Sequence, residues 1–215
     1  MQAVVVTDGR HERSRRTRQK IVAAATDLFV RNGYGSTSIA AIAAHAGVAV
    51  QTVYAAFGTK RAVLSAALDQ AITGDDVGVV VNARDWMRDV FEAPTAVKRL
   101  TAYAASVRRI LAGAGELFTV VVTAATVDAE VVELAEITEQ RRRAGARSVI
   151  DSILTISSLR DGLDPERATA VLSMLNSPAT FDHLVRRCGW SLDDYQQWLA
   201  KAMIRELLPP KAARA

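Results

Sequence analysis

The sequence predicts an all-α fold, and three observations support this prediction. Alanine, leucine and glutamate, which lose little side-chain freedom in a helix, are abundant, and only five of the 215 residues are proline. Several segments repeat apolar residues at the helical spacing i, i+3, i+4, i+7. Sustained alternation of apolar and polar residues, which is typical of a strand, is almost absent. Because half of the residues are hydrophobic, we expect a packed core.

Four helices are expected in the first 74 residues. The first runs from Ser14 to Asn32, and Ser36 or Thr37 caps the second, which ends at Gly47. The third covers residues 49–57 and the fourth begins at Lys60, after the cap residue Thr59. Their apolar faces are Ile21, Ala24, Ala25, Leu28 and Phe29; Ile39, Ile42, Ala43 and Ala46; Val50, Val53, Tyr54 and Phe57; and Val63, Leu64, Ala67, Leu68 and Ala71.

The second and third helices are short and are joined by a turn that contains Gly47, which predicts a helix-turn-helix. In such a pair the second helix enters the DNA major groove. The outer face of the third helix carries Gln51, Thr52 and Ala55. Gln51 can pair with adenine through two hydrogen bonds, and Thr52 can bond a base or pack its methyl group against thymine. Both are candidate base-reading residues.

Basic residues gather at two helix N-termini. Arg15, Arg16, Arg18 and Lys20 lie in the first turns of the first helix, and Lys60 opens the fourth. A cation is disfavoured at the positive end of a helix dipole unless an anion such as DNA phosphate lies nearby. Residues 1–60 hold eight lysines and arginines against three acidic residues, whereas residues 61–215 hold nineteen against twenty. This asymmetry favours a nucleic-acid-binding end and a solvated basic tail about equally.

Each candidate also has a plain structural explanation: Tyr54 as core, Thr37 as a helix cap, Lys60 as a solvated charge. Together, however, the spacings resemble the DNA-binding domain of the TetR family. The resemblance runs from about Arg15 to Gly74 and rests on Thr37-Ser38-Ile39, Ile42-Ala43, Ala46-Gly47-Val48, Val53-Tyr54, Phe57 and Lys60. Two positions depart from it, Ala49 where the family often has a capping serine, and Ala55-Ala56 before Phe57.

The resemblance implies a homodimer whose two recognition helices occupy successive major grooves of a palindromic operator, usually as a repressor that a ligand releases. It implies contacts with double-stranded DNA at Thr37, Gln51, Thr52, Tyr54 and Lys60. With the basic residues and the start of the second helix, the candidate DNA-binding set is Arg15, Arg18, Thr37, Ser38, Gln51, Thr52, Tyr54 and Lys60.

The rest of the chain is expected to be a helical body. Residues 73–93 are predicted as mostly loop with a short helix around Trp86, followed by a helix from Pro94 to Gly113 and a short one to about Thr123. A long helix follows from the cap Asp128 to about Ser157. Later starts are predicted at Asp164-Pro165-Glu166, at Ser177-Pro178 and at Ser191 with Asp194, and the last helix ends before Pro209.

The resulting division is a disordered basic arm (1–13), a helix-turn-helix DNA-binding domain (14–74, with the motif at about 38–57), a helical ligand-binding and dimerisation domain (75–208) and a tail (209–215). Two late helices have apolar faces that a second copy could cover: Val171, Leu172 and Leu175, and Trp198, Leu199 and Met203. Polar and aromatic residues among the apolar helices suggest a small-molecule effector site, with the ordinary core as the alternative. These residues are Trp86, Phe91, Tyr103, Phe118, Thr123 and Asn176.

No catalytic, cofactor-binding or metal-ligating motif is recognisable, and His11, His45 and His183 are dispersed. We therefore expect no enzyme, no cofactor and no metal. Cys188, the single cysteine, is expected to be half-buried. No segment reaches the length of about 20 apolar residues that a membrane span needs, and no secretory signal precedes the domain, so the cytoplasm is expected. The alternative function is a helical adaptor or structural dimer with weak, non-specific DNA binding.

Overall fold

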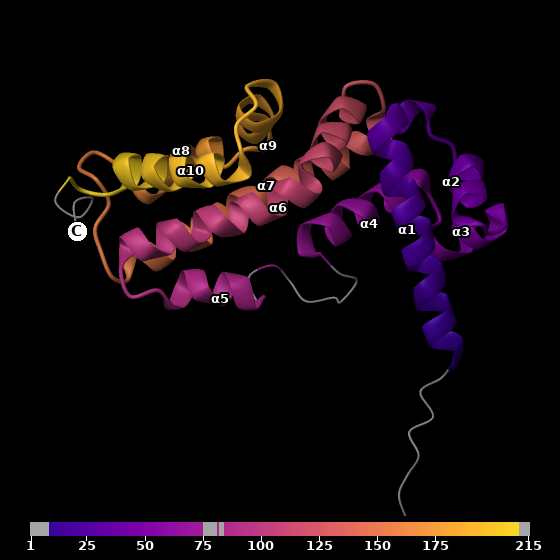
Figure 1. The fold of residues 1–215 in the computed structure, drawn as a ribbon, viewed down its shortest axis with the longest axis horizontal. Coiled ribbons are helices and arrows are strands. Elements are labelled where there is room, and N and C mark those ends of the chain that lie inside the picture. The colour runs from indigo at the N-terminus through magenta and orange to yellow at the C-terminus, as the bar shows by residue number, and fades with distance from the viewer. Residues whose placement is uncertain (1–8, 75–80, 82–83, 211–215) are drawn as a thin grey trace, which may run out of the picture.

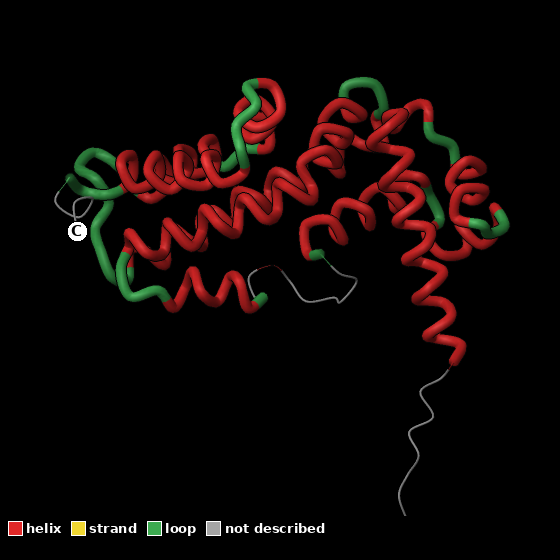
Figure 2. The backbone as a smooth tube through the Cα atoms, in the orientation of Figure 1, coloured by secondary structure: helices red, strands yellow, loops and turns green. Residues whose placement is uncertain are grey.

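The computed structural model describes residues 9–74, 81 and 84–210. Helices connected by short loops account for these residues, and no strand occurs among them (Figure 2). The all-α prediction is confirmed. The tail residues 211–215 and the first eight residues of the predicted arm lie outside the described part. Residues 9–13, predicted as part of that disordered arm, are instead the start of the first helix.

The N-terminal end consists of α1 (Gly9–Ser36), α2 (Ile39–Ala46), α3 (Val50–Phe57) and α4 (Lys60–Thr73). In Figure 1, α1 stands across the end of the body, and its first turns project beyond every other helix. Gly33 has a φ of 76° and interrupts the helical conformation of α1, close to the predicted end at Asn32. A left-handed φ is sterically open to glycine, so Gly33 sets the turn that leads to α2.

The body consists of α5 (Asp85–Glu92), α6 (Ala96–Ala125), α7 (Ala129–Leu154), α8 (Pro165–Leu175), α9 (Pro178–Phe181), a π-helical turn η2 (Asp182–Arg187) and α10 (Leu192–Leu207). The two longest helices of the body, α6 and α7, run side by side (Figure 1). Helix α5 packs on one side of α6 and α10 on the opposite side, while α8 packs against α7 and α10. Helix α5 confirms the predicted short helix around Trp86.

Local capping signals place most helix starts correctly. Side-chain oxygens of Thr59, Asp128, Asp164, Ser177 and Ser191 accept hydrogen bonds from backbone N–H groups of the first helical turn, as predicted. The cap of α2 is Ser38, which accepts from the Ala41 N–H at 3.0 Å. The predicted caps at residues 36 and 37 were therefore wrong by one or two residues.

Helix α6 continues through Gly113, where the sequence predicted a break. The reason is packing: a Cβ added at Gly113 would lie 3.1 Å from the backbone oxygen of Ala71 in α4. At Gly115 a Cβ would lie 3.5 Å from the Phe181 ring. Both glycines thus allow close approach of neighbouring helices, which outweighs the low helix propensity of glycine, about 1 kcal/mol below alanine.

The two predicted domains share one core. Buried apolar side chains form a continuous cluster from Ile21 in α1 to Leu208 after α10. Helix α4 contributes Val63, Leu64 and Leu68 to it and contacts both α1 and α6. Because the boundary predicted at residue 74 crosses a single core, movement of the body is mechanically connected to α1 and α4.

Candidate nucleic-acid interface

Helices α2 and α3 meet at an angle of 107°, within the range of about 90–120° that is typical of a helix-turn-helix. Gly47, with a φ of 67°, makes the turn between them. The Gly47 N–H donates to the backbone oxygens of Ala43 and Ala44, and the Val48 N–H donates to that of Ala43 at 3.0 Å. This closes α2 with its last carbonyls paired. The turn therefore fixes the direction in which α3 leaves.

One buried side chain anchors α3 to the core. Val53 is fully buried, whereas Gln51 is exposed, Thr52 is half-buried and Tyr54 is 53% exposed. The prediction that Tyr54 packs on the buried side of this helix was wrong, and the ring lies on the outer face with Gln51. The outer face is small and carries no charge along 50–57, a surface shape that allows close approach to base edges.

Thr37 lies on the inside of the domain. Its side chain is 2% exposed, and its hydroxyl donates to the Gly33 oxygen at 2.8 Å and lies 3.2 Å from the Leu28 oxygen. A hydroxyl that is buried and paired in this way is not placed to touch DNA. Thr37 instead closes the turn between α1 and α2, so the predicted side-chain contact is corrected to a structural role.

Arg15 and Ser38 both lie on the surface. The Arg15 guanidinium pairs with Glu12 at 3.1 Å, and Arg16 pairs with the same carboxylate at 3.2 Å. These two arginines hold the pKa of Glu12 below its ordinary value, Arg15 having the larger effect. Exposed pairs of this kind contribute little to stability, so both guanidinium groups can exchange partners.

Arg18 and Lys60 both contact backbone oxygens and aromatic rings within the domain. The Arg18 guanidinium donates to the backbone oxygen of Ala56, and its carbon Cζ lies 4.1 Å from the centre of the Phe57 ring. The Lys60 ammonium donates to the Tyr34 oxygen at 2.9 Å and lies 4.0 Å from the centre of the Tyr34 ring. Sequence reasoning missed these contacts, because they join residues 26 and 38 positions apart.

The six predicted effector residues do not form one site. Trp86 and Phe91 are half-buried on α5, with the Arg109 Cζ atom 5.5 Å from the centre of the Trp86 ring. Tyr103 and Phe118 are buried in α6, and Thr123 is exposed near its end. At 1.5 Å per residue, Phe118 and Thr123 are roughly 22 and 30 Å along α6 from Tyr103. A single small molecule does not reach all of them.

The structure does bring Tyr103 and Asn176 together. The Asn176 side-chain N–H group donates to the Tyr103 hydroxyl at 2.8 Å, and its oxygen accepts from Arg142 at 2.6 Å. Burial raises the pKa of Tyr103 to about 12. Tyr195 in α10, which sequence reasoning missed, is fully buried with no hydrogen-bond partner for its hydroxyl. Burial, with a smaller contribution from Tyr103, raises the pKa of Tyr195.

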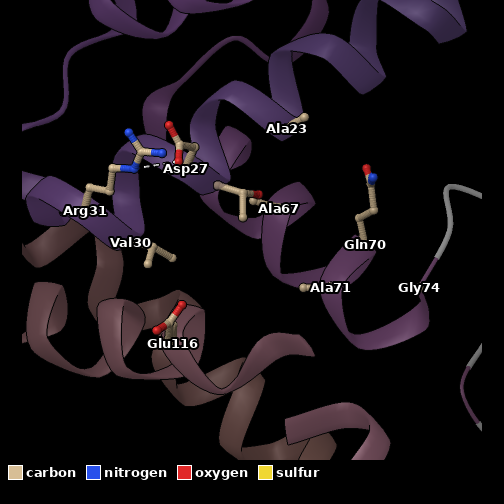
Figure 3. Close-up of a pocket in the computed structure, with 10 residues that line it drawn as sticks. Ala23, Asp27, Val30, Arg31, Ala67, Gln70, Ala71, Gly74 and Glu116 are labelled. Carbon is tan, nitrogen blue, oxygen red and sulfur yellow. Dashed lines mark ion pairs between the residues drawn. The ribbon is translucent and has the colours of Figure 1, made fainter. Parts of the chain in front are cut away.

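Two open grooves among the described residues flank α4, and neither contains a predicted effector residue. The larger, of about 500 Å³, lies between α1, α4 and α6. Figure 3 shows Asp27 and Arg31 paired on one wall and Glu116 below them. The smaller, of about 290 Å³, lies between α4 and α7 beside the ion pairs Arg61–Glu133 and Arg141–Asp69.

Within the described part of the chain, no three histidine, cysteine, aspartate or glutamate side chains are grouped so as to hold a metal ion. No single described helix combines the length and apolar character needed to cross a membrane; α2 and α3 reach that composition only as a pair bent by 107°. Cys188, predicted to be half-buried, is exposed, with its sulfur 3.6 Å from Nε2 of His183.

The predicted dimer faces are mostly buried within the single chain. Leu172, Leu199 and Met203 are fully buried, so they are not available to a partner. Other large apolar side chains of the body are exposed: Val122, Val127, Val132, Leu154, Ile156 and Met174, the last at 62%. Val171 and Trp198, also predicted for the dimer faces, are half-buried, and their contact with a second copy stays a prediction.

A family model described as bacterial regulatory proteins of the tetR family matches residues 21–67. No curated protein sequence matches the chain significantly. Solved structures do. NalD, the secondary repressor of the MexAB-OprM multidrug efflux pump in Pseudomonas aeruginosa, is 21% identical, with a TM-score of 0.66 over 92% of this chain and 98% of that one.

Two further solved structures share the fold over most of the chain. A protein from Saccharomonospora viridis, described as a transcriptional regulator in complex with choline, is 20% identical, with a TM-score of 0.66 over 89% of this chain and 97% of that one. A protein from Rhodococcus sp., described as a TetR-family transcriptional regulator, is 16% identical, with a TM-score of 0.65 over 87% and 96%. At these identities the likeness establishes the fold over most of the chain, including the body.

Proposed function

Because the chain belongs to the TetR family of bacterial regulatory proteins, we propose that it is a sequence-specific DNA-binding transcriptional repressor. It acts as a homodimer on a palindromic operator, in the cytoplasm with the chromosome, and a small-molecule effector releases it. The observation that carries the proposal is the helix-turn-helix itself: α2 and α3 cross at 107°, and α3 turns a small polar face outward.

The outer face of α3 reads the operator. Gln51 bonds an adenine through its amide, and Thr52 and the exposed Tyr54 contact neighbouring bases or sugars. Arg15 contacts a phosphate, since its exposed guanidinium can give up a weak surface partner. The exposed hydroxyl of Ser38 donates to a phosphate while its oxygen continues to cap α2. The uncharged α3 contributes specificity, and the cations of α1 contribute salt-dependent affinity.

A second copy of the chain covers exposed apolar surface on α7 and α8. Val132 and Leu154 lie near the two ends of α7, about 33 Å apart at 1.5 Å per residue, and Met174 lies on α8. All three are large, apolar and accessible, so the proposed interface runs along α7 and α8. The dimer must place its two α3 helices about 34–36 Å apart, which is one turn of DNA. Any change of the body that alters this spacing lowers operator affinity.

The effector binds in the body. Its polar anchor consists of Tyr103 and Asn176 together with a third group, the buried hydroxyl of Tyr195. This hydroxyl has no protein partner, and a buried polar group without a partner costs about 1–3 kcal/mol. A ligand with a hydrogen-bond acceptor would remove that cost. The structures from Saccharomonospora viridis, with choline, and of NalD, a drug-efflux repressor, make small organic effectors the class to screen. Trp86, Phe91, Phe118 and Thr123 stay predictions.

Release follows from linkage between the two sites. An effector that prefers a conformation with mis-spaced α3 helices shifts the population toward it, and DNA must weaken effector binding by the same factor. The shared core of α1, α4 and α6 offers a physical route for this coupling.

The experiment that tests the proposal is selection of bound sequences from a random DNA library by the purified protein. Enrichment of a palindrome supports a dimeric repressor and supplies an operator for effector screening. With several phosphates neutralised, the logarithm of the affinity should fall with the logarithm of salt concentration by about 0.9 per phosphate. A folded protein that enriches no sequence, or binds with no salt dependence, supports the alternative of a helical adaptor and overturns the proposal.

A further inference from the structure

Helix α3 is too short to hold its own position. It has eight residues, whereas an isolated helix needs about 12–15 residues even for marginal stability in water. Val53 is its one fully buried side chain, and its cap residue Ala49 makes no side-chain hydrogen bond. Val50, Ala56 and Phe57 are only partly buried against the core, so contacts at the other end of α3 add to what fixes the orientation of its outer face.

Arg18 supplies such a contact. Its guanidinium reaches from α1 to the backbone oxygen of Ala56 and lies over the face of the Phe57 ring, 4.1 Å from its centre. Ala56 and Phe57 are the last two residues of α3. A cation there meets the negative end of the helix dipole and an orphan carbonyl together. The same charge is also attracted by the π face of the ring.

Lys60 makes the equivalent contact on the other side of the loop between α3 and α4. Its ammonium, at the start of α4, donates to the Tyr34 oxygen at 2.9 Å and lies 4.0 Å from the Tyr34 ring centre. Tyr34 belongs to the last turn of α1 and is buried. Arg18 thus connects the end of α3 to the first half of α1, and Lys60 connects the start of α4 to the last turn of α1.

We propose that Arg18 is a positioning residue that orients the recognition helix, and that it does not neutralise a DNA phosphate. The first turns of a recognition helix enter the groove, whereas Arg18 contacts the opposite end of α3. Its hydrogen bond and ring contact engage its charge with partners in the same domain. We call the contacts of Arg18 with Ala56 and Phe57 the clamp. The inference rests on the proposed function for what α3 reads, whereas the clamp is a property of the free protein.

The test compares Arg18→Met with Lys20→Met. Both variants remove one cation from α1, but Lys20 is exposed and makes no hydrogen bond or ion pair with the described residues. Amide hydrogen exchange of the free protein should become roughly tenfold faster at residues 54–58 in Arg18→Met, because α3 loses its terminal anchor. Lys20→Met should leave it unchanged. Unchanged exchange in Arg18→Met overturns the proposal, whether or not the protein binds an operator.

The salt dependence of operator binding gives the second readout. Arg18→Met should weaken binding while the slope of log affinity against log salt stays at the wild-type value. If Arg18 neutralises a phosphate, the slope for the dimer should decrease by about 1.8, at about 0.9 per phosphate. A decrease of that size overturns the proposal.

One variant covers the case in which Arg18→Met does not fold. Phe57→Leu keeps the cation and most of the side-chain volume but removes the ring beneath Arg18. It should also speed exchange at residues 54–58, and wild-type exchange there contradicts the clamp. Failure of the wild type to enrich any DNA sequence would instead reject the proposed function, while the exchange experiment would still decide the clamp.

Discussion

The DNA-binding end and the body place their polar groups in opposite ways. Along α3, Gln51 and Tyr54 face outward, and a single valine is buried. Between α6, α8 and α10, Tyr103, Asn176 and Tyr195 face inward and are buried, one of their hydroxyls without a partner. Polar groups on the outer surface suit contact with a large ligand such as DNA. The buried hydroxyl without a partner lowers the stability of the body unless a small molecule forms a hydrogen bond with it.

The two regions should also contribute differently to the free energy of unfolding. The body contains long helices that share many buried side chains, so its core should dominate the free energy of unfolding. Helices α2 and α3 are held by few buried side chains. Substitutions in these two helices should alter DNA binding more than the free energy of unfolding. The following variants test this division, from the largest expected effect on stability to the smallest.

Leu172→Ala should destabilise the protein by about 2–5 kcal/mol, because it leaves a cavity in the body. Leu172 is fully buried in α8, whereas Met174 in the same helix is 62% exposed. Denaturant unfolding of the two alanine variants measures the difference. A loss below about 1 kcal/mol for Leu172→Ala would show that the body core is not what holds the fold. Met174→Ala should leave unfolding nearly unchanged, and it should weaken dimerisation if α8 lies in the interface.

Gly113→Val should destabilise by about 1–3 kcal/mol, because the new side chain forces α4 away from α6. A Cβ at this position already lies 3.1 Å from the Ala71 oxygen. Gly145 in α7 has open space around it, so Gly145→Val is the matched control and should gain a few tenths of a kcal/mol from helix propensity. Equal thermal stability of the two variants would contradict the close contact between α4 and α6.

These contacts explain which features could be predicted from the sequence. Caps such as Asp128 and Ser191 depend on residues two or three positions away, so the helix starts were accessible. The helix-turn-helix was accessible for the same reason. Gly113 was interpreted as a stop, because its role depends on Ala71 in another helix.

The site was less accessible, since its decisive contacts join distant positions. The bond between Asn176 and Tyr103 spans 73 residues, and the contact of Arg18 with Ala56 spans 38. Hydrophobic periodicity assigned Tyr54 to the core because the apolar stripe of α3 includes it, yet only the packing of α2 against α3 decides which part of that stripe is covered. The choice of effector residues failed where it assumed one pocket for positions spread along α6.

Tyr103→Phe should cost about 1–3 kcal/mol, because it leaves the buried amide of Asn176 without an acceptor. Tyr195→Phe removes a hydroxyl that has no protein partner, so it should be neutral or should stabilise by up to about 1 kcal/mol. Denaturant unfolding of both variants compares the same chemical change at two buried rings. If Tyr195→Phe destabilises as much as Tyr103→Phe, a bound water or ligand already satisfies the Tyr195 hydroxyl.

Gln51→Ala should change the free energy of unfolding by no more than about 0.5 kcal/mol, because the side chain is exposed and off the core. On the selected operator it should cost about 1–3 kcal/mol at one base position and relax the preference there. Gln197→Ala makes the same substitution at an exposed position of α10, far along the chain from α3, and should change neither quantity. Binding of single-base operator variants, measured beside unfolding, separates reading from stability. If Gln51→Ala keeps every base preference of the wild type, Thr52 and Tyr54 are the residues that read the bases. The base-reading surface of α3 is then smaller than its exposed face.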